Sequence, residues 1–181
     1  METATQNLEN DHKYILRLIN VMELMTENKV TSIGDIEGVI NLIQKFADGF
    51  HHAKEENLLF PLLSQKGFSP EQGPVAVMLN EHIQGRNFVN GMANQLLQIK
   101  QNESFDYSPV YENMAGYAEL LRSHIAKENN VLFRMADNVL SESEQKELIK
   151  EFDAIETLLP SGQTFSDWLF RIEHLEKIYH P

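Results

Sequence analysis

The amino-acid sequence predicts an all-α protein, an up-and-down four-helix bundle followed by one or two additional C-terminal helices. Two observations support this fold class. Apolar residues recur at helical spacing in four long segments between residues 7 and 140, and the connections between these segments are short. In addition, residues 51–60 and 124–133 repeat each other almost residue for residue, which indicates a duplicated helical unit.

The first two segments carry a histidine on their apolar stripe. Over residues 7–27, His12 falls between Leu8 and Ile15 at helical spacing. Residues 28–34 are expected to form a loop, after which Ser32 and Asp35 match a helix-capping pattern. The inward face of the second helix is expected to carry Ile36, Ile40, Ile43, Ala47, His51, Glu55, Leu58 and Leu62.

The next two segments repeat this plan. Glycines and prolines at residues 67–74 mark a turn, and the third helix then carries Val75, Met78, His82, Val89 and Leu96 on one side. Ser108-Pro109 is typical of the cap and first turn of a fourth helix. Its inward face is expected to be Met114, Tyr117, Leu121, His124, Glu128, Val131, Leu132 and Met135.

The last forty residues predict further helices. Ser141 with Glu144 matches a capping box for a fifth helix that ends near Pro160, and Thr164 with Asp167 starts a sixth through Tyr179. Composition marks no second folding unit. We therefore expect a bundle over residues 1–140 and an extension over residues 141–181 that packs on it, or that forms a homodimer with a second copy.

Composition and charge exclude several classes of function. The chain has no cysteine, so a metal would have to be bound by histidine nitrogen and carboxylate oxygen, a ligand set that suits iron, zinc or manganese. The formal net charge of -12 and the lack of a basic cluster argue against nucleic acid and membrane partners. Without a long apolar run or a secretion signal, a cytoplasmic location is expected.

The repeated motif places metal-ligand types on one helix face. A histidine followed four residues later by a glutamate puts both side chains on the same side of an α-helix. Aligning the copies pairs His51 with Glu55 and rotates His52 and Glu56 by roughly 100° around the helix. Burial of such groups without a cation would leave charges unpaired. The predicted metal ligands are His12, His51, Glu55, His82, His124 and Glu128.

The other candidate residues have plainer interpretations. His52, His174 and His180 are out of phase with the site or lie in the tail, so no metal role is expected for them. Arg86, one turn beyond His82, is either a surface ion pair or a donor behind the ligands. Tyr117 is expected to be a core aromatic residue.

These motifs resemble the hemerythrin-like, or HHE cation-binding, domains over roughly residues 7–140. The resemblance implies a four-helix bundle with two non-haem iron ions bridged by an oxo or hydroxo group, with zinc or manganese less favoured. Residues 73–78 ahead of Glu81-His82, together with residues 124–133, are most similar to the C-terminal domain of the repair-of-iron-centres proteins. Those proteins are implicated in restoring iron–sulfur clusters after nitrosative or oxidative stress.

The chain also departs from both patterns. Oxygen-carrying hemerythrins have a further histidine where this chain has Arg86, and an aspartate five residues after the last histidine rather than Glu128 four after it. The repair proteins usually have an extra histidine between the first two helices, and this sequence has none between His12 and His51. They also have a small cysteine-bearing N-terminal domain, which is not found in this sequence. These differences argue against simple inheritance of either activity.

The sequence therefore predicts a di-iron protein that binds or reacts with O2, NO or peroxide in oxidative or nitrosative stress, or in iron–sulfur centre repair. Two alternatives stay open at this point. One is a metal-dependent sensor or binding module without turnover, and the other is iron storage or buffering. Whether the chain is an enzyme is left undecided.

Overall fold

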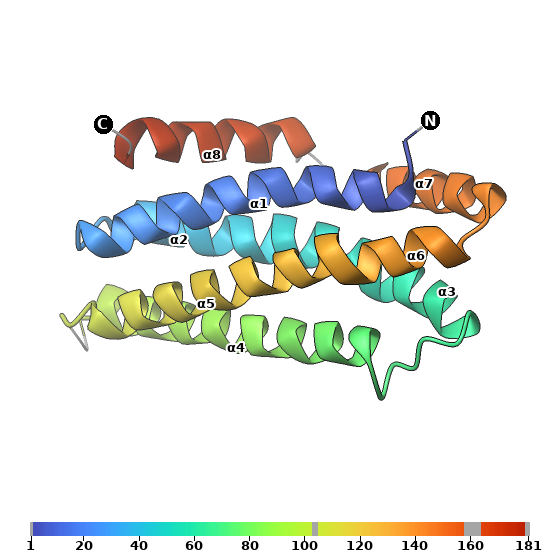
Figure 1. Cartoon of the computed structure of the whole chain (residues 1–181). Coiled ribbons are helices and arrows are strands. Elements are labelled where there is room, and N and C mark those ends of the chain that lie inside the picture. Colours follow the sequence, from blue (N-terminus) through green and yellow to red (C-terminus); the bar gives the residue numbers. More distant parts are fainter. Residues whose placement is uncertain (1, 103–104, 158–163, 180–181) are drawn as a thin grey trace.

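The computed structural model describes residues 2–102, 105–157 and 164–179, and within these ranges every regular element is a helix. This confirms the predicted all-α class. Four long helical rods lie side by side, and α8 runs along the outside of α1 (Figure 1). The helices are α1 (Ala4–Glu27), α2 (Ile33–Leu42), α3 (Phe60–Gln65), α4 (Pro74–Lys100), α5 (Ser108–Lys127), α6 (Phe133–Val139), α7 (Glu142–Thr157) and α8 (Phe165–Tyr179).

Three π-helical segments connect shorter α-helices into two of the four rods. The segments η1 (Ile43–His52) and η2 (Glu55–Leu59) lie between α2 and α3, and η3 (Glu128–Leu132) joins α5 to α6. A π-helical turn takes one more residue than an α-helical turn, so it rotates everything that follows relative to a 3.6-residue period. The motif residues His51, Glu55 and Glu128 all lie in these segments.

Side-chain capping explains where α1 and α2 begin. Ser32 accepts a hydrogen bond from the Asp35 backbone N–H as predicted, and Thr3 forms a capping box with Gln6 that starts α1 earlier than expected. The prediction that Ser108 caps the fourth helix was wrong. The cap residue is Tyr107, and the Ser108 backbone N–H donates to the Asp106 carboxylate at 2.9 Å.

The apolar residues form two clusters on either side of the motif residues. On α1, Leu8 belongs to one cluster and Ile15 to the other, with His12 between them. The same order holds on α4, where His82 lies between Met78 and Val89. The histidines and glutamates therefore occupy a polar layer that is closed off from water at both ends of the bundle.

The π-helical turn in η3 changes which side chains face the core. The 3.6-residue period predicts Val131 and Met135 on the inward face, but both are exposed, Val131 at 49%. Leu132, at 1% exposure, and Ala136 are buried. The extra residue in the turn shifts the stripe by one position, which a uniform helical period cannot anticipate.

This shift predicts a contrast between neighbouring substitutions. Leu132→Ala should lower the free energy of unfolding by about 2–5 kcal/mol, because it removes a buried side chain and leaves a cavity. Val131→Ala should stay within about 0.5 kcal/mol of the wild type, because Val131 is exposed. Urea unfolding of both variants measures the difference. A larger loss for Val131→Ala than for Leu132→Ala would contradict the π-helical phase.

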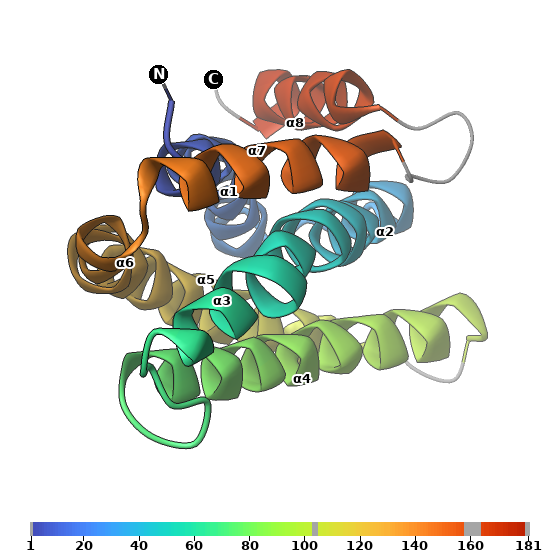
Figure 2. The same cartoon turned by 90° about the vertical axis from the view of Figure 1, so that its right-hand side faces the viewer.

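The two C-terminal helices cover α1 and one end of the bundle (Figure 2). Both predicted capping boxes are present, since the Ser141 and Thr164 backbone N–H groups donate at 2.8 Å to Glu144 and Asp167. The apolar face of α8 joins the larger core cluster through Trp168 and its neighbours. The expected end of the fifth helix near Pro160 lies outside the described residues, and a homodimer through these helices stays a prediction.

The capping box of α7 predicts a pH-dependent contribution to stability. Hydrogen bonds from Lys66 and from Ser141 lower the pKa of Glu144 from 4.5 to about 2. A depressed pKa stabilises the folded state above the unfolded value, so this contribution is full above pH 4.5 and fades as the pH falls towards 2. The stability difference between wild type and Glu144→Gln, measured by chemical unfolding, should shrink over that range. A difference that grows on acidification would disprove it.

Candidate metal centre

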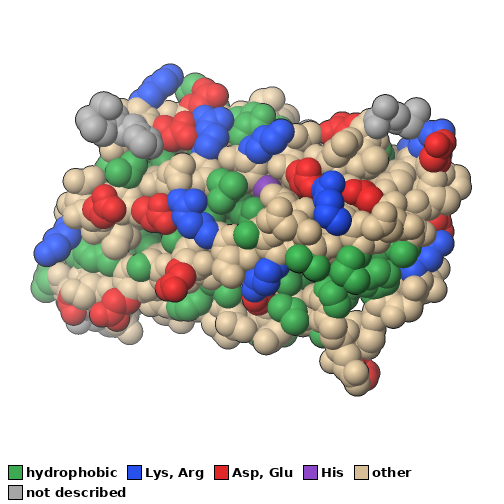
Figure 3. All heavy atoms as spheres, in the orientation of Figure 1, with side chains coloured by type: hydrophobic (Ala, Val, Ile, Leu, Met, Phe, Trp, Pro, Cys, Tyr) green, Lys and Arg blue, Asp and Glu red, His purple; other side chains and the backbone are tan. Residues whose placement is uncertain are grey.

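The structure brings all six predicted ligands together in the polar layer, and each is almost completely buried. Four of them form two facing histidine pairs. The Nε2 atoms of His12 and His51 are 3.0 Å apart, and those of His82 and His124 are 3.2 Å apart. On the face drawn in Figure 3, only a small area of histidine reaches the surface, in keeping with this burial.

The two glutamates lie between the histidine pairs. Glu55 Oε1 is 3.6 Å from His51 Nε2, and its Oε2 is 3.4 Å from His82 Nε2. Glu128 Oε2 is 3.2 Å from both His12 Nε2 and His124 Nε2. Each carboxylate therefore touches one histidine of each pair, which is the placement that a bridge between two metal ions requires.

His52 belongs to this cluster, and the expectation that it points away was wrong. Its side chain is only 5% exposed, and its ring stacks on His82 with centroids 3.8 Å apart and planes 16° apart. The π-helical segment η1 lets two consecutive histidines face inward, where an α-helix would separate them by roughly 100°. The doubled histidine in the sequence was the signal, and the assumed 3.6-residue period concealed it.

The ligand atoms fall into two groups with one shared member. Within each group, one atom from every residue lies within 4.8 Å of the others. Glu55 is common to both groups. The groups are His12, His51, Glu55 and Glu128 on one side, and His52, Glu55, His82 and His124 on the other.

Every histidine of the cluster has an oxygen atom next to its Nδ1. His51 faces Asp11 at 3.3 Å and His52 faces Asp48 at 3.2 Å. On the other helices the pattern is the same. The remaining pairs are His12 with Asn129 at 2.7 Å, His82 with Glu56 at 2.6 Å and His124 with Glu81 at 3.0 Å.

These acceptors determine which ring nitrogen of a neutral histidine carries the proton. The other ring nitrogen then needs a cation as its partner. A carboxylate or amide oxygen accepts the proton on Nδ1, which leaves Nε2 as an unprotonated nitrogen. Two such lone pairs then face each other 3.0 Å apart at His12 and His51. All four oxygens of Glu55 and Glu128 are buried without a hydrogen-bond partner. A metal ion satisfies both sets of atoms at once.

The electrostatics of the cluster differ between its histidines. At His124, burial lowers the pKa, but the Glu128 and Glu81 carboxylates outweigh this and raise the pKa to about 9, so a metal ion would have to displace a proton there. Burial lowers the pKa of His51 to about 4 against the opposing hydrogen bond to Asp11, so the imidazole is neutral and able to bind a metal. Burial and the nearby Glu128 carboxylate raise the pKa of Glu55 well above its usual value. A metal cation would reverse that effect, because it favours the charged form of the carboxylate.

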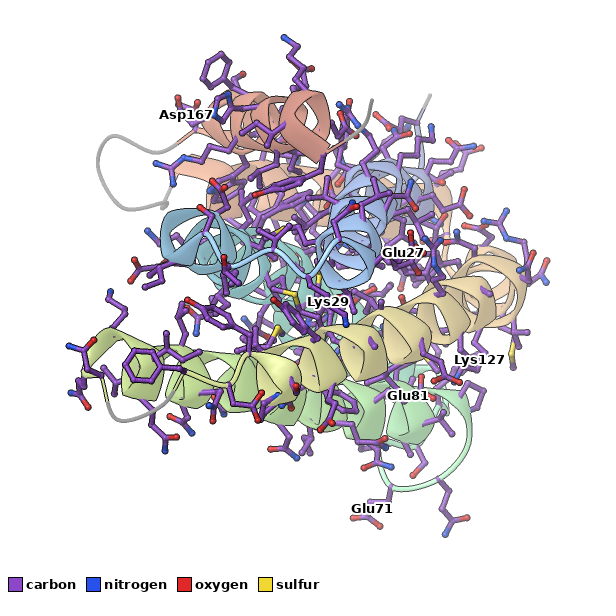
Figure 4. The ribbon with its side chains drawn as sticks, turned by 90° about the vertical axis from the view of Figure 1, so that its left-hand side faces the viewer. Glu27, Lys29, Glu71, Glu81, Lys127 and Asp167 are labelled. Carbon is purple, nitrogen blue, oxygen red and sulfur yellow. The ribbon has the colours of Figure 1, made fainter. Side chains whose placement is uncertain are left out.

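The residues that hold the histidines repeat between the two halves of the chain. In each half, the acidic residue that directly precedes the first histidine ligand accepts a hydrogen bond from the histidine of the repeated motif. It also accepts a hydrogen bond from the lysine that follows this motif histidine by three residues. Lys54 Nζ thus lies 2.8 Å from Asp11 Oδ2, which in turn faces His51. Glu81, Lys127 and His124 form the same chain on α4 and α5, where Figure 4 shows Glu81 and Lys127 close together.

Each half of the chain also supplies a hydrogen-bond acceptor to a histidine of the other half, and these two acceptors differ in charge. Glu56, which follows Glu55, accepts from His82, while Asn129, which follows Glu128, accepts from His12. The duplication thus puts a carboxylate behind one histidine and a neutral amide behind its counterpart. Around His52, His82 and His124 all three acceptors are carboxylates, so a metal ion held by these histidines would have the more electron-rich ligands.

Arg86 and Tyr117 can also be placed. The Arg86 guanidinium donates to Asp48 at 2.7 Å and to Glu56 at 2.8 Å, so it supports the acceptors of His52 and His82. Tyr117 is 3% exposed, as expected of a core aromatic residue, but it also lines a cavity beside the cluster.

Comparison with known proteins agrees with this site. A model of the hemerythrin HHE cation-binding domain matches residues 3–136. The curated relatives include proteins named iron-sulfur cluster repair protein YtfE from Escherichia coli O157:H7, Escherichia coli K12 / DH10B and Shigella boydii serotype 18. Each is 31% identical over 96 residues, which is 48% of this chain and 40% of the relative. No solved structure matches the chain significantly.

Proposed function

This chain belongs to the family of the hemerythrin HHE cation-binding domain, and on that premise we propose that it binds two non-haem iron ions in the cluster. His12 and His51 would hold one ion, His52, His82 and His124 would hold the other, and Glu55 and Glu128 would supply carboxylate oxygens between them. Ferrous ions would supply electrons and an open position for a small ligand. The function we propose is binding or reduction of O2, NO or peroxide.

The observation that carries this proposal is the set of buried atoms without partners. Four buried carboxylate oxygens accept no hydrogen bond, and they lie next to imidazole nitrogens whose Nδ1 atoms face an acceptor on the far side of the ring. Leaving such groups unpaired costs several kcal/mol or more in total, so the arrangement favours a resident cation over a purely structural role. Histidine-rich ligation favours iron chemistry with small molecules over ferritin-like storage, which uses more carboxylates.

A role in iron-centre repair under oxidative or nitrosative stress is the finer proposal. The relatives named as iron-sulfur cluster repair proteins support it, although the match spans only about 40% of their length. The chain has no cysteine, so any iron that it donates must leave from histidine and carboxylate ligands. Iron held in that way is exchangeable when its ligands are protonated.

The proposed reactivity is tested by adding O2, NO and hydrogen peroxide, one at a time, to anaerobically iron-loaded protein. We expect charge-transfer absorption that changes with at least one reagent and that is absent from the zinc-loaded protein. His124→Ala, which removes one ligand of the second position, should lose most of that change. An iron-loaded wild-type protein whose spectrum is indifferent to all three reagents would refute the reactivity.

One observation favours a second function, a metal-dependent sensor. Lys54 links the cluster to a C-terminal helix, because its Nζ binds Asp11 and also lies 5.6 Å from the Phe152 ring of α7. A change at His51 could thus reach α7 through Asp11 and Lys54. Hydrogen exchange in α7 should then slow on metal binding, without consumption of any reagent.

A further inference from the structure

A cavity of about 180 Å³ lies beside the cluster, between η1, α4 and α5. Three histidines of one proposed metal position, His52, His82 and His124, form part of its wall. The rest of its lining includes apolar side chains of the three elements, together with Tyr117, Gly85 and Arg86. The pair His12 and His51 is not part of this wall, so the cavity opens onto one metal position only.

The size of the cavity exceeds what a diatomic ligand needs. An apolar cavity of roughly 150 Å³ in another protein is large enough to bind benzene. The space here is comparable, and much of its wall is formed by the side chains of Ile43, Val89 and Leu121. Such a wall favours a ligand with an apolar body.

The charges around the cavity favour a neutral ligand. Arg86 is the only Lys or Arg among the lining residues, and its guanidinium is already paired with Asp48 and Glu56. Asp48 and Glu81 add negative charge to the wall. Apart from the proposed metal position, the wall therefore offers an anion no free positive charge.

Tyr117 offers the cavity a hydrogen-bond donor. Its side chain is almost completely buried, and its hydroxyl has no hydrogen-bond partner among the described residues. Burial raises the pKa of Tyr117, so the hydroxyl keeps its proton. A ligand oxygen in the cavity would supply the partner that the protein does not.

Gly85 keeps the cavity open. It lies in the interior of α4, where glycine is an unfavourable residue for a helix. A Cβ atom at this position would lie 3.5 Å from Tyr117 Cε2, which is an ordinary contact. Alanine would therefore fit, and a larger side chain would extend into the space beside the tyrosine.

We propose that this cavity binds a small neutral organic molecule with one hydrogen-bond-accepting oxygen, the class of alkyl hydroperoxides and their alcohols. The oxygen accepts from Tyr117, and the alkyl part lies against Ile43, Val89 and Leu121. This inference deepens the proposed function and rests on it only for the reactive member of the class, the hydroperoxide. Binding itself needs no redox chemistry.

The test uses cyclohexanol as the probe and zinc-loaded full-length protein, which is redox-inert. Titration followed by NMR should give saturable shifts of resonances from Tyr117, Val89 and Leu121. Tyr117→Phe should weaken binding about tenfold through the lost hydrogen bond. Gly85→Leu should abolish binding, and Gly85→Ala, which fits without displacement, should weaken it. Gly38→Leu on α2, where a Cβ meets nothing within 4 Å, is the matched control and should bind as the wild type does.

Two results would overturn the proposal. They are no saturable binding of cyclohexanol to the wild type, and equal binding by Gly85→Leu and wild type. These results are separate from those that test the proposed function. If the iron-loaded protein does not react with O2, NO or hydrogen peroxide while the zinc-loaded protein binds cyclohexanol, the proposed reactivity is wrong but the proposed ligand site is supported.

Discussion

Replacing Glu55 by glutamine is expected to reduce the metal content from two ions per chain to at most one. Glu55 is the one residue common to both ligand groups, and its two oxygens approach His51 and His82 from opposite sides of the site. The amide loses the negative charge that offsets two cations, and it cannot bridge them through two equivalent oxygens. Elemental analysis after loading and desalting gives the stoichiometry.

The same variant should not destabilise the metal-free protein. The Glu55 carboxylate is buried without a hydrogen-bond partner, and burial raises its pKa, so the neutral amide should cost no stability there. Thermal unfolding of metal-free Glu55→Gln should therefore begin no earlier than that of the wild type, while the stabilisation by added metal should be smaller than in the wild type. Glu119→Gln, exposed on α5, is the matched control. Two bound ions in Glu55→Gln would contradict the bridging role.

Exchanging charge between Glu56 and Asn129 should change the affinities of the two metal positions in opposite directions. Glu56→Gln replaces the carboxylate that accepts from His82, and should weaken the binding of one ion by about 10–100-fold. Asn129→Asp places a carboxylate behind His12 and should strengthen the binding of the other ion. The physical reason is that a charged acceptor on Nδ1 makes Nε2 a more basic ligand.

Stepwise titration of metal-free protein with Co²⁺ against a competing chelator resolves the two affinities. Asn130→Asp is the control for charge alone. Asn130 lies next to Asn129 but is exposed, and within the described part of the chain its side chain donates to the Ala126 carbonyl rather than to a histidine. This variant should leave both steps unchanged. Equal shifts of both steps in Glu56→Gln, or no shift in either charge variant, would show that the asymmetry between the halves does not set the order of binding.

The positions of His12, His51, His82 and His124 could be predicted from the sequence because each falls on an apolar stripe with helical spacing. The residues that accept hydrogen bonds from these histidines were harder to predict. Asp11, Glu56 and Glu81 are sequence neighbours of ligands, but a charged residue beside a buried one usually faces solvent, and only the packing of another helix decides otherwise. Their roles depend on contacts between helices.

The errors of the sequence analysis in and after the repeated motifs share one physical cause. The predictions for His52, Val131 and Met135 all assume a constant α-helical period through the motif, whereas the chain widens into π-helical turns there. π-helical turns are frequent at functional sites because they turn additional side chains inward. The cavity beside the cluster was also beyond sequence reasoning, since it depends on how Gly85 and Tyr117 meet across two helices.

The central claim is that the buried histidines and glutamates hold a pair of iron ions bridged by protein carboxylates. Its most direct test is the iron content per chain of the anaerobically loaded and desalted wild-type protein, with Mössbauer spectroscopy of the same sample after oxidation. The account predicts two irons per chain and the diamagnetic ground state of a coupled ferric pair. One iron per chain, or two irons with the spectra of isolated ions, would contradict it.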